Sequence, residues 1–399
     1  MRLGWIDFSK EDRKKVLSVI DLLSEDGTLD ELGIAPIRDG FADLFFPGTS
    51  TIQTRAKYFL IVPYAFNDLA RQPETNPETL LKKLNDIERR CGQLLVAENA
   101  DGTIGSRTIK SGGWVKRTPS DIYWSGIRRY GLFTDRAMSL AEYARSSCTI
   151  KKQKLELKKL GNRNDDITEY DRDDADAGAS FSTSFWKLPP YPGNWMDSLT
   201  MTLTPEEASF LKTQIESTQP QTLFAHILQS GHLKVSKMTD FWALGNSGLI
   251  KSFPEGMRND YAMALAFSVF IYGARIRYNI ILSEGKNETA NDEWEDFRKH
   301  VTEHASVDID AIFARLKIVN PGLRQFLGDV QDSLRSGNTP GLDDFIRKRE
   351  EDLKGPSRAK LNRAGEFPAD AWLGGGKLDY RFENAMTIVR DIFQGLEAA

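Results

Sequence analysis

The longest apolar run in this 399-residue chain is YAMALAFSVFIYGARI, from Tyr261 to Ile276. Its apolar residues fall on every side of a helix, so a helix here must be surrounded by other parts of the chain. Charged residues flank the run, and it is shorter than the roughly 20 residues that a membrane-spanning helix needs. The run therefore predicts a buried core helix and not a membrane span.

Helix signals recur along the rest of the chain, whereas strand signals are sparse. Thr118 and Thr204 each precede a proline and stand three residues before an acid, which is the pattern of a capped helix start. The glycine-rich stretch Asn99–Arg117 instead favours a loop or a small β-hairpin. We predict a mainly α, multi-helical fold with a minor β element. The hairpin beside a short helix would resemble part of a winged-helix or helix-turn-helix unit in the N-terminal half.

An acidic stretch, GNRNDDITEYDRDDADAG, interrupts the helical pattern at residues 161–178. It holds seven acids and two arginines, for a net charge of −5, and few apolar groups that could be buried. Such a composition predicts a linker or an exposed loop. We therefore divide the chain into a basic-faced N-terminal domain at 1–160, an acidic linker at 161–180 and a helical C-terminal domain at 181–399.

The charge of the chain is unevenly distributed. Its formal net charge is −4 and its pI is about 5.8, which excludes a bulk nucleic-acid coat protein. Residues 101–160, however, contain thirteen Lys or Arg and only five acids. A basic block in an acidic protein predicts a localised site for a polyanion, with the acidic stretch as an internal competitor.

The cysteine content and the N-terminal sequence indicate the cellular compartment. The two cysteines, Cys91 and Cys148, are too few for a disulfide framework and form no CxxC pair, which fits a reducing compartment. The sequence begins without the apolar segment and small-residue cleavage site of a signal peptide. We expect a cytoplasmic protein that does not associate with membranes.

The first candidate site is PGTSTIQTRAKYF, from Pro47 to Phe59. A helix N-terminus offers backbone N–H groups to a phosphate, and nearby hydroxyl and basic side chains would add contacts. The candidate phosphate ligands are Thr49, Ser50, Thr51, Gln53, Arg55 and Lys57. The stretch lacks the GxxxxGK[ST] pattern, so nucleotide hydrolysis is not predicted. The alternative is a helix capped by Ser or Thr, with Arg55 in a salt bridge.

The second candidate is a basic and aromatic unit that follows it. Cations neutralise phosphates and aromatic rings stack on bases, so this mixture suits nucleic acid, with DNA as the expected form. The candidate residues are Arg107, Lys110, Lys116, Arg117, Tyr123, Trp124, Arg128 and Arg129. The alternative is that Trp124 packs in the core while the basic residues form a solvated face.

The third candidate is HVTEH, His300 to His304, which fits the inverted zinc-protease pattern H-x-x-E-H. Both histidines could bind zinc, with Glu303 as the general base. No third ligand stands out, and the surrounding helix is so highly charged that such matches arise by chance. A metal-dependent hydrolase is therefore the least favoured reading, and we predict no catalytic residue, metal or cofactor.

Four motifs carry a resemblance to a bacterial protein family of unknown function. They are LGWIDFS (Leu3–Ser9), LFFPGTSTIQTRAKYFLIVPY (Leu44–Tyr64), PSDIYWSGIRRYGL (Pro119–Leu132) and LDYRFENAMTIVRDI (Leu378–Ile392). The resemblance implies an accessory component of an anti-phage defence system that works beside helicases and nucleases. It implies no catalytic residues.

These observations together predict a non-catalytic nucleic-acid-binding subunit of a defence complex. The alternative is a scaffold that binds a helicase or nuclease partner and has no nucleic-acid affinity of its own.

Overall fold

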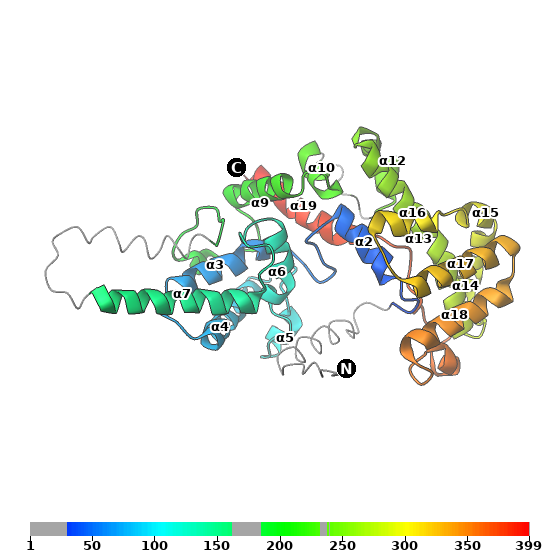
Figure 1. Cartoon of the computed structure of the whole chain (residues 1–399), viewed down its shortest axis with the longest axis horizontal. Helices are drawn as coiled ribbons and strands as arrows, with labels where there is room; N and C mark the ends of the chain where they lie inside the picture. The colour runs from blue at the N-terminus through cyan, green and yellow to red at the C-terminus, as the bar shows by residue number, and fades with distance from the viewer. Residues whose placement is uncertain (1–29, 162–184, 232–237, 239, 399) are drawn as a thin grey trace, which may run out of the picture. The chain divides into compact units, whose positions relative to one another are not determined.

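The computed structural model describes residues 30–161, 185–231, 238 and 240–398. This part of the chain is mainly helical and contains no β-strand, so the predicted multi-helical fold is confirmed (Figure 1). The motif Leu3–Ser9 and most of the acidic stretch predicted at 161–178 lie outside the described residues.

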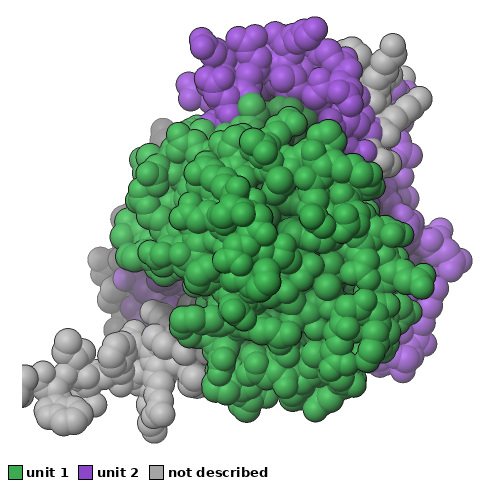
Figure 2. All heavy atoms as spheres, turned by 90° about the vertical axis from the view of Figure 1, so that its right-hand side faces the viewer, with its two compact units in different colours: residues 1–38, 261–378 green, residues 39–260, 379–399 purple. Residues whose placement is uncertain are grey.

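The chain forms two compact units, and each is assembled from two separate stretches of sequence (Figure 2). Unit 1 comprises residues 1–38 and 261–378, and unit 2 comprises residues 39–260 and 379–399. This division differs from the one predicted from sequence, because none of its three boundaries falls at 161–180. The last helix returns to unit 2, which a reading of consecutive segments cannot reveal.

Unit 2 contains the helices of residues 39–260 together with the last helix of the chain. In chain order they are α2 (Ala35–Phe45, with its first turn in the unit 1 stretch), α3 (Tyr58–Ala70), α4 (Pro77–Ala97), α5 (Ser106–Lys110), α6 (Pro119–Arg129), α7 (Leu140–Gly161), η1 (Trp195–Ser198), α9 (Pro205–Thr218), α10 (Leu223–Ser230), α12 (Ala243–Asn246), η2 (Leu249–Ser252) and α19 (Phe382–Glu397).

Unit 1 contains the remaining helices. They are α13 (Glu255–Leu282, with its first turn in the unit 2 stretch), α14 (Glu288–Arg298), α15 (Val301–His304), α16 (Ile309–Leu316), α17 (Pro321–Ser336), α18 (Thr339–Lys354) and η3 (Leu361–Glu366).

Helix α3 is the centre of unit 2. Its sequence, YFLIVPYAFNDLA, is apolar on nearly every side, and all of its residues except Asp68 are buried. Helices α4 and α6 pack against it, and α9 packs against α19. The approach of α6 depends on Gly126, because a Cβ there would lie 2.5 Å from both the Gly48 carbonyl oxygen and the Phe59 ring. This packing determines where the side chains of α6 can point.

The predicted helix starts are confirmed. Thr118 and Thr204 each accept a hydrogen bond from the backbone three residues later, while the acid at that position bonds back to the cap. Asn76 caps α4: its side chain accepts hydrogen bonds from the backbone N–H groups of Glu78 and Thr79. These signals are contained within four residues, which is why sequence alone reveals them.

The prediction of a β-hairpin in Asn99–Arg117 was wrong. The stretch forms the short helix α5 between tight turns, and within it Gly102, Gly105 and Gly112 have φ values of +75°, +70° and +82°. Three left-handed residues in eleven interrupt extended pairing. Because the described residues contain no strand, the wing that a winged-helix unit requires is absent from them.

The predicted core helix is confirmed as α13, which forms the centre of unit 1. Among the described residues it is the single helix long and apolar enough to cross a membrane, and 78% of its most apolar window is buried. Its Asn279 accepts hydrogen bonds from the N–H groups of Leu373 and Gly374, and its Ser268 bonds to the backbone of Leu378. A glycine-rich loop is thereby fastened along the helix.

Candidate nucleic-acid interface

The residues of the predicted phosphate loop, Pro47–Lys57, form hydrogen bonds and ion pairs with other residues of unit 2. The Nε atom of Arg55 lies 2.9 Å from Oδ1 of Asp391, and its Nη1 donates to the carbonyl of Asp101. Asp391 also accepts the N–H of Ala56 at 2.7 Å. Burial raises the pKa of Asp391 above its ordinary value, although the bonds from Arg55 and Ala56 oppose this. Arg55 therefore serves as an ion-pair partner of α19.

The polar side chains of this loop are also turned inward. Thr49 is buried and donates its hydroxyl to a carbonyl of its own turn. Gln53 is buried too, since its Nε2 donates to the carbonyl of Gly48 and its Oε1 accepts from the N–H of Ser50. The Ser50 hydroxyl is buried without a partner, and Thr51 alone of these four is exposed. The loop as a whole does not present a cluster of hydroxyl groups to solvent.

Helix α19 fixes the backbone of the same loop. Asn384 donates from Nδ2 to the carbonyls of Thr51 and Gln53, at 3.2 and 3.1 Å. Arg381 donates to the carbonyl of Thr49 at 3.0 Å. These bonds satisfy carbonyl groups that an irregular loop would otherwise leave unpaired. The geometry is that of a structural junction between the N-terminal and C-terminal stretches of unit 2.

Lys57 forms a buried ion pair with Glu207. Its Nζ lies 2.5 Å from Oε2 of Glu207, and the side chains of both residues are about 7% exposed. The hydroxyl of Tyr64 donates to the other oxygen of Glu207 at 3.1 Å, and burial raises the pKa of Tyr64. A buried pair of this kind leaves no free ammonium group for a phosphate.

The two predicted stacking residues, Tyr123 and Trp124, lie in the core. The Tyr123 hydroxyl accepts the N–H groups of Thr54 and Arg55 and donates to the Arg55 carbonyl, so it is fully used. Burial raises the pKa of Tyr123 to about 12. Trp124 is 6% exposed and donates Nε1 to the carbonyl of Met138. Neither ring offers a surface on which a base could stack.

The two arginines at the end of α6 differ from each other. Arg128 is half-buried, and its Nη1 donates to the carbonyls of three consecutive residues, Arg136, Ala137 and Met138. It therefore clamps the turn before α7. Arg129 is exposed at the C-terminal end of α6.

The cations around α5 remain available to solvent. Arg107 and Lys110 on α5 and Lys116 in the following turn are exposed, whereas Arg117 is half-buried. None of the three exposed side chains has a carboxylate partner in the described part of the chain. Of the predicted cations, these three and Arg129 are exposed and have no carboxylate partner among the described residues, and only these three lie on α5 or the turn after it.

Two further cations, Arg89 and Arg90 on α4, were missed by the sequence analysis and are exposed. Helix α5 and the turn after it pack on this part of α4, because Trp114 donates Nε1 to Asn85 at 2.6 Å. Gly92, on the same side of α4 as Asn85, leaves room for the Trp114 ring. Arg89 lies between these two contact points, one turn after Asn85. The helical spacing of Arg89 from Asn85 and Gly92 could have placed all three residues on one side of α4 from the sequence alone.

Five of the exposed cations of unit 2 form what we call the basic face: Arg89, Arg90, Arg107, Lys110 and Lys116. They come from α4, from α5 and from the turn after α5, which pack together (Figure 1). An exposed acid, Asp86, lies one turn before Arg89 and Arg90 and reduces the local charge. The face can neutralise backbone phosphates, and it has no group suited to chemistry.

The HVTEH segment does not form the expected site. His300 is the N-cap of α15, with φ −122°, and so lies outside the helix that should bring both histidines to one face. The two imidazole rings are 5.9 Å apart, and burial lowers the pKa of His304. No group of three or more potential metal ligands occurs among the described residues. The metal-dependent alternative therefore has no third ligand in this part of the chain.

A family model matches residues 1–309 of this chain, well over half of its length. The chain belongs to DUF6361, a family of unknown function. Three of the four motifs noted in the sequence fall within the match, and the fourth, Leu378–Ile392, lies beyond it. No curated protein and no solved structure matches the chain.

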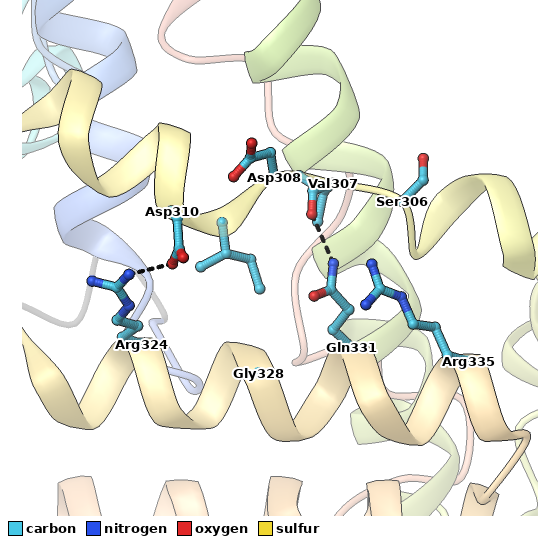
Figure 3. A pocket seen from close by; sticks show the side chains of 9 residues that line it. Ser306, Val307, Asp308, Asp310, Arg324, Gly328, Gln331 and Arg335 are labelled. Atoms are coloured by element: carbon cyan, nitrogen blue, oxygen red, sulfur yellow. Dashed lines mark hydrogen bonds and ion pairs between the residues drawn. The ribbon is translucent and has the colours of Figure 1, made fainter.

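Beyond the residues matched to DUF6361, α17 forms one side of an open groove of about 510 Å³ in unit 1 (Figure 3). Arg324, which pairs with Asp310, lies at one end, and Arg335 lies at the other. Gly328 lies between them, and a Cβ at this position would meet nothing within 4 Å. A glycine inside a helix costs about 1 kcal/mol relative to alanine. No packing constraint explains Gly328, whose missing side chain leaves the floor of the groove open.

Proposed function

We propose that this chain is a non-catalytic nucleic-acid-binding subunit that contacts backbone phosphates through the basic face. The observation that carries the proposal is the exposure of five cations on packed elements, without carboxylate partners among the described residues. Phosphate contacts of this kind supply most of the affinity of sequence-independent binding. The surrounding block of thirteen basic residues and five acids supports the same reading.

The proposed contact is to the backbone and not to bases. All tryptophans and tyrosines in the described part of unit 2 are buried or half-buried, and none belongs to the basic face, so we propose no base stacking at this face. The proposed contact does not include the predicted phosphate loop or the predicted stacking residues, because their side chains bond to other groups inside unit 2. We therefore expect weak dependence on sequence and strong dependence on salt.

The experiment is a fluorescence-anisotropy titration of labelled DNA duplex across a salt series. Five phosphate contacts give a limiting slope of about −4.5 for log K against log salt, at roughly −0.9 per contact. The triple variant R107Q/K110Q/K116Q should flatten this slope by about 2.7 and weaken binding to every sequence.

A matched control removes three exposed cations elsewhere, as K251Q/R258Q/K317Q, and changes the net charge equally. This control should keep the slope of the unmodified protein. Equal slopes for the two triple variants would contradict the assignment to the basic face. Absence of binding by the unmodified protein at low salt would contradict nucleic-acid binding altogether.

A second candidate function is a scaffold for a helicase or nuclease within an anti-phage complex. The groove above Gly328 favours it, since an unfilled helix surface between two arginines suits a protein segment. Gly328→Gln would fill the groove without straining the backbone. Loss of co-purification with such a partner, with DNA binding unchanged, would support the scaffold, and unchanged co-purification would contradict it.

A further inference from the structure

A second groove, in unit 2, has features that the proposed backbone contact does not use. It has a volume of about 410 Å³ and lies between the C-terminal end of α3 and the segment Trp186–Tyr191. This volume is within the range of small-molecule sites. Its lining includes two aromatic residues, two prolines, an asparagine and an arginine.

The aromatic walls of the groove are held rigidly by rings behind them. Trp186 stacks on Phe66 at a centroid distance of 5.5 Å, and its Nε1 donates to the hydroxyl of Tyr143 at 2.8 Å. Tyr191 stacks on Tyr64 at 4.0 Å. The prolines at 189 and 190 restrict the backbone between these two rings. The groove is therefore a preformed surface for a flat ligand and needs little ordering on binding.

The orientation of Asn67 follows from its neighbours. The hydroxyl of Tyr191 has one proton, which it donates to the carboxylate of Asp68 at 3.2 Å. The same hydroxyl must then accept from Asn67, whose Nδ2 lies at 2.7 Å. The amide nitrogen of Asn67 therefore faces Tyr191. Its Oδ1 has no donor within the described residues, although the residue is only 6% exposed and lines the groove.

A ligand in the groove would cover this amide oxygen, which has no donor among the described residues, so the groove selects for a ligand that brings a hydrogen-bond donor. Arg71 lies at the rim of the same groove and is exposed, with no carboxylate partner in the described part of the chain. Its guanidinium group is suited to a phosphate. The groove thus offers flat apolar walls, one acceptor and one cation.

We propose that this groove binds a nucleotide whose base has an exocyclic amine. The base lies against the half-buried ring of Tyr191, next to the largely buried Trp186, the amine donates to Oδ1 of Asn67, and the phosphate pairs with Arg71. Cytosine, adenine and guanine carry such an amine. Uracil presents a carbonyl oxygen in place of the cytosine amine, and this oxygen would repel Oδ1. The proposal does not depend on the basic face, because it concerns other residues and a single nucleotide.

The test is isothermal titration calorimetry of the full chain with CMP, UMP and cytidine. CMP and UMP differ only along one edge of the base, where the C4 amine and acceptor N3 of cytosine become a carbonyl and an N–H in uracil, so the comparison tests the contact to Asn67. We expect CMP to bind about tenfold more tightly than UMP, the effect of one buried hydrogen bond left unmade. We expect cytidine to bind more weakly than CMP, because it lacks the phosphate.

The variant Arg71→Gln should reduce CMP affinity to that of cytidine and leave cytidine binding unchanged. Arg90→Gln, an equal change of charge on the basic face, should leave CMP binding unchanged. Equal affinities for CMP and UMP, or no saturable binding of CMP, AMP or GMP up to about 5 mM, would overturn the proposal. Such a failure would not affect the duplex titrations, which report on the basic face separately.

Discussion

A buried carboxyl group next to the basic face makes the stability of unit 2 sensitive to pH. Glu88, in the middle of α4, is 1% exposed. Its Oε1 accepts the N–H of Ser120 at 2.6 Å, at the start of α6. Burial raises the pKa of Glu88 to about 8 from an ordinary value of 4.5, against the opposing effect of the bonds from Ser120. The perturbation we consider is Glu88→Gln, which keeps the shape and an acceptor oxygen but cannot ionise.

The sign and size of the effect follow from these two values. Below pH 4.5 the group is protonated in both the folded and the unfolded chain, so stability is at its full value. Between pH 4.5 and about 8 the unfolded chain loses the proton and the folded chain keeps it. The free energy of unfolding therefore falls as pH rises, by about 1.4 kcal/mol per pH unit, or roughly 4 kcal/mol from pH 5 to pH 8. Above pH 8 this contribution is lost and the slope from Glu88 disappears.

The assay is urea unfolding of the original chain and of Glu88→Gln at four pH values from about 5 to 8, followed by tryptophan fluorescence. The difference between the two proteins isolates Glu88 from the other titrating groups. We expect the variant to be relatively more stable with each step up in pH. Parallel stability curves for the two proteins would refute the argument that Glu88 is neutral in the folded chain.

The remaining predictions concern packing in unit 2, with a control variant on α17 of unit 1. Lys57→Met should leave the charge of Glu207 buried and unpaired and destabilise the chain by about 3–5 kcal/mol. Adding Glu207→Gln should restore much of this loss in urea unfolding, and a double variant as unstable as the single one would contradict the buried pair. Gly126→Ala should cost about 1–3 kcal/mol, because its Cβ would meet the Gly48 carbonyl oxygen at 2.5 Å. Gly328→Ala is the control, since its Cβ meets nothing within 4 Å and the change should stabilise the helix by about 1 kcal/mol. Equal thermal stability of the two alanine variants would contradict the packing argument.

The parts of the fold that sequence revealed are those determined by neighbouring residues. The caps at Thr118 and Thr204 are examples, because each depends on side chains within four positions. The core helix α13 was also predictable, because its apolar residues surround the helix axis. The hairpin prediction failed because the composition of a glycine-rich loop does not reveal its dihedral angles.

The candidate site residues were harder to judge from sequence, because the exposure of each side chain depends on partners that are distant in the sequence. Nothing in the sequence around Arg55 or Lys57 indicates that Asp391 and Glu207 neutralise them. Charge density did locate exposed cations, since Arg107, Lys110 and Lys116 are exposed in the fold. Burial, and not residue type, separates the exposed cations, such as Arg107 and Lys110, from Arg55 and Lys57, which form ion pairs inside unit 2.

The junction between the loop at Pro47–Lys57 and α19 also constrains the order of events during synthesis. Arg55 and Asp391 are 336 residues apart, which at about 5–20 residues per second corresponds to roughly 20–70 s of translation. During that interval the loop has left the ribosome while the helix that fixes it does not yet exist. Unit 2 can reach its final packing only when the chain is nearly complete, although most of its sequence is made first. Until α19 is made, the loop and, once it is synthesised, the inner face of α9 therefore lack the helix that packs on them.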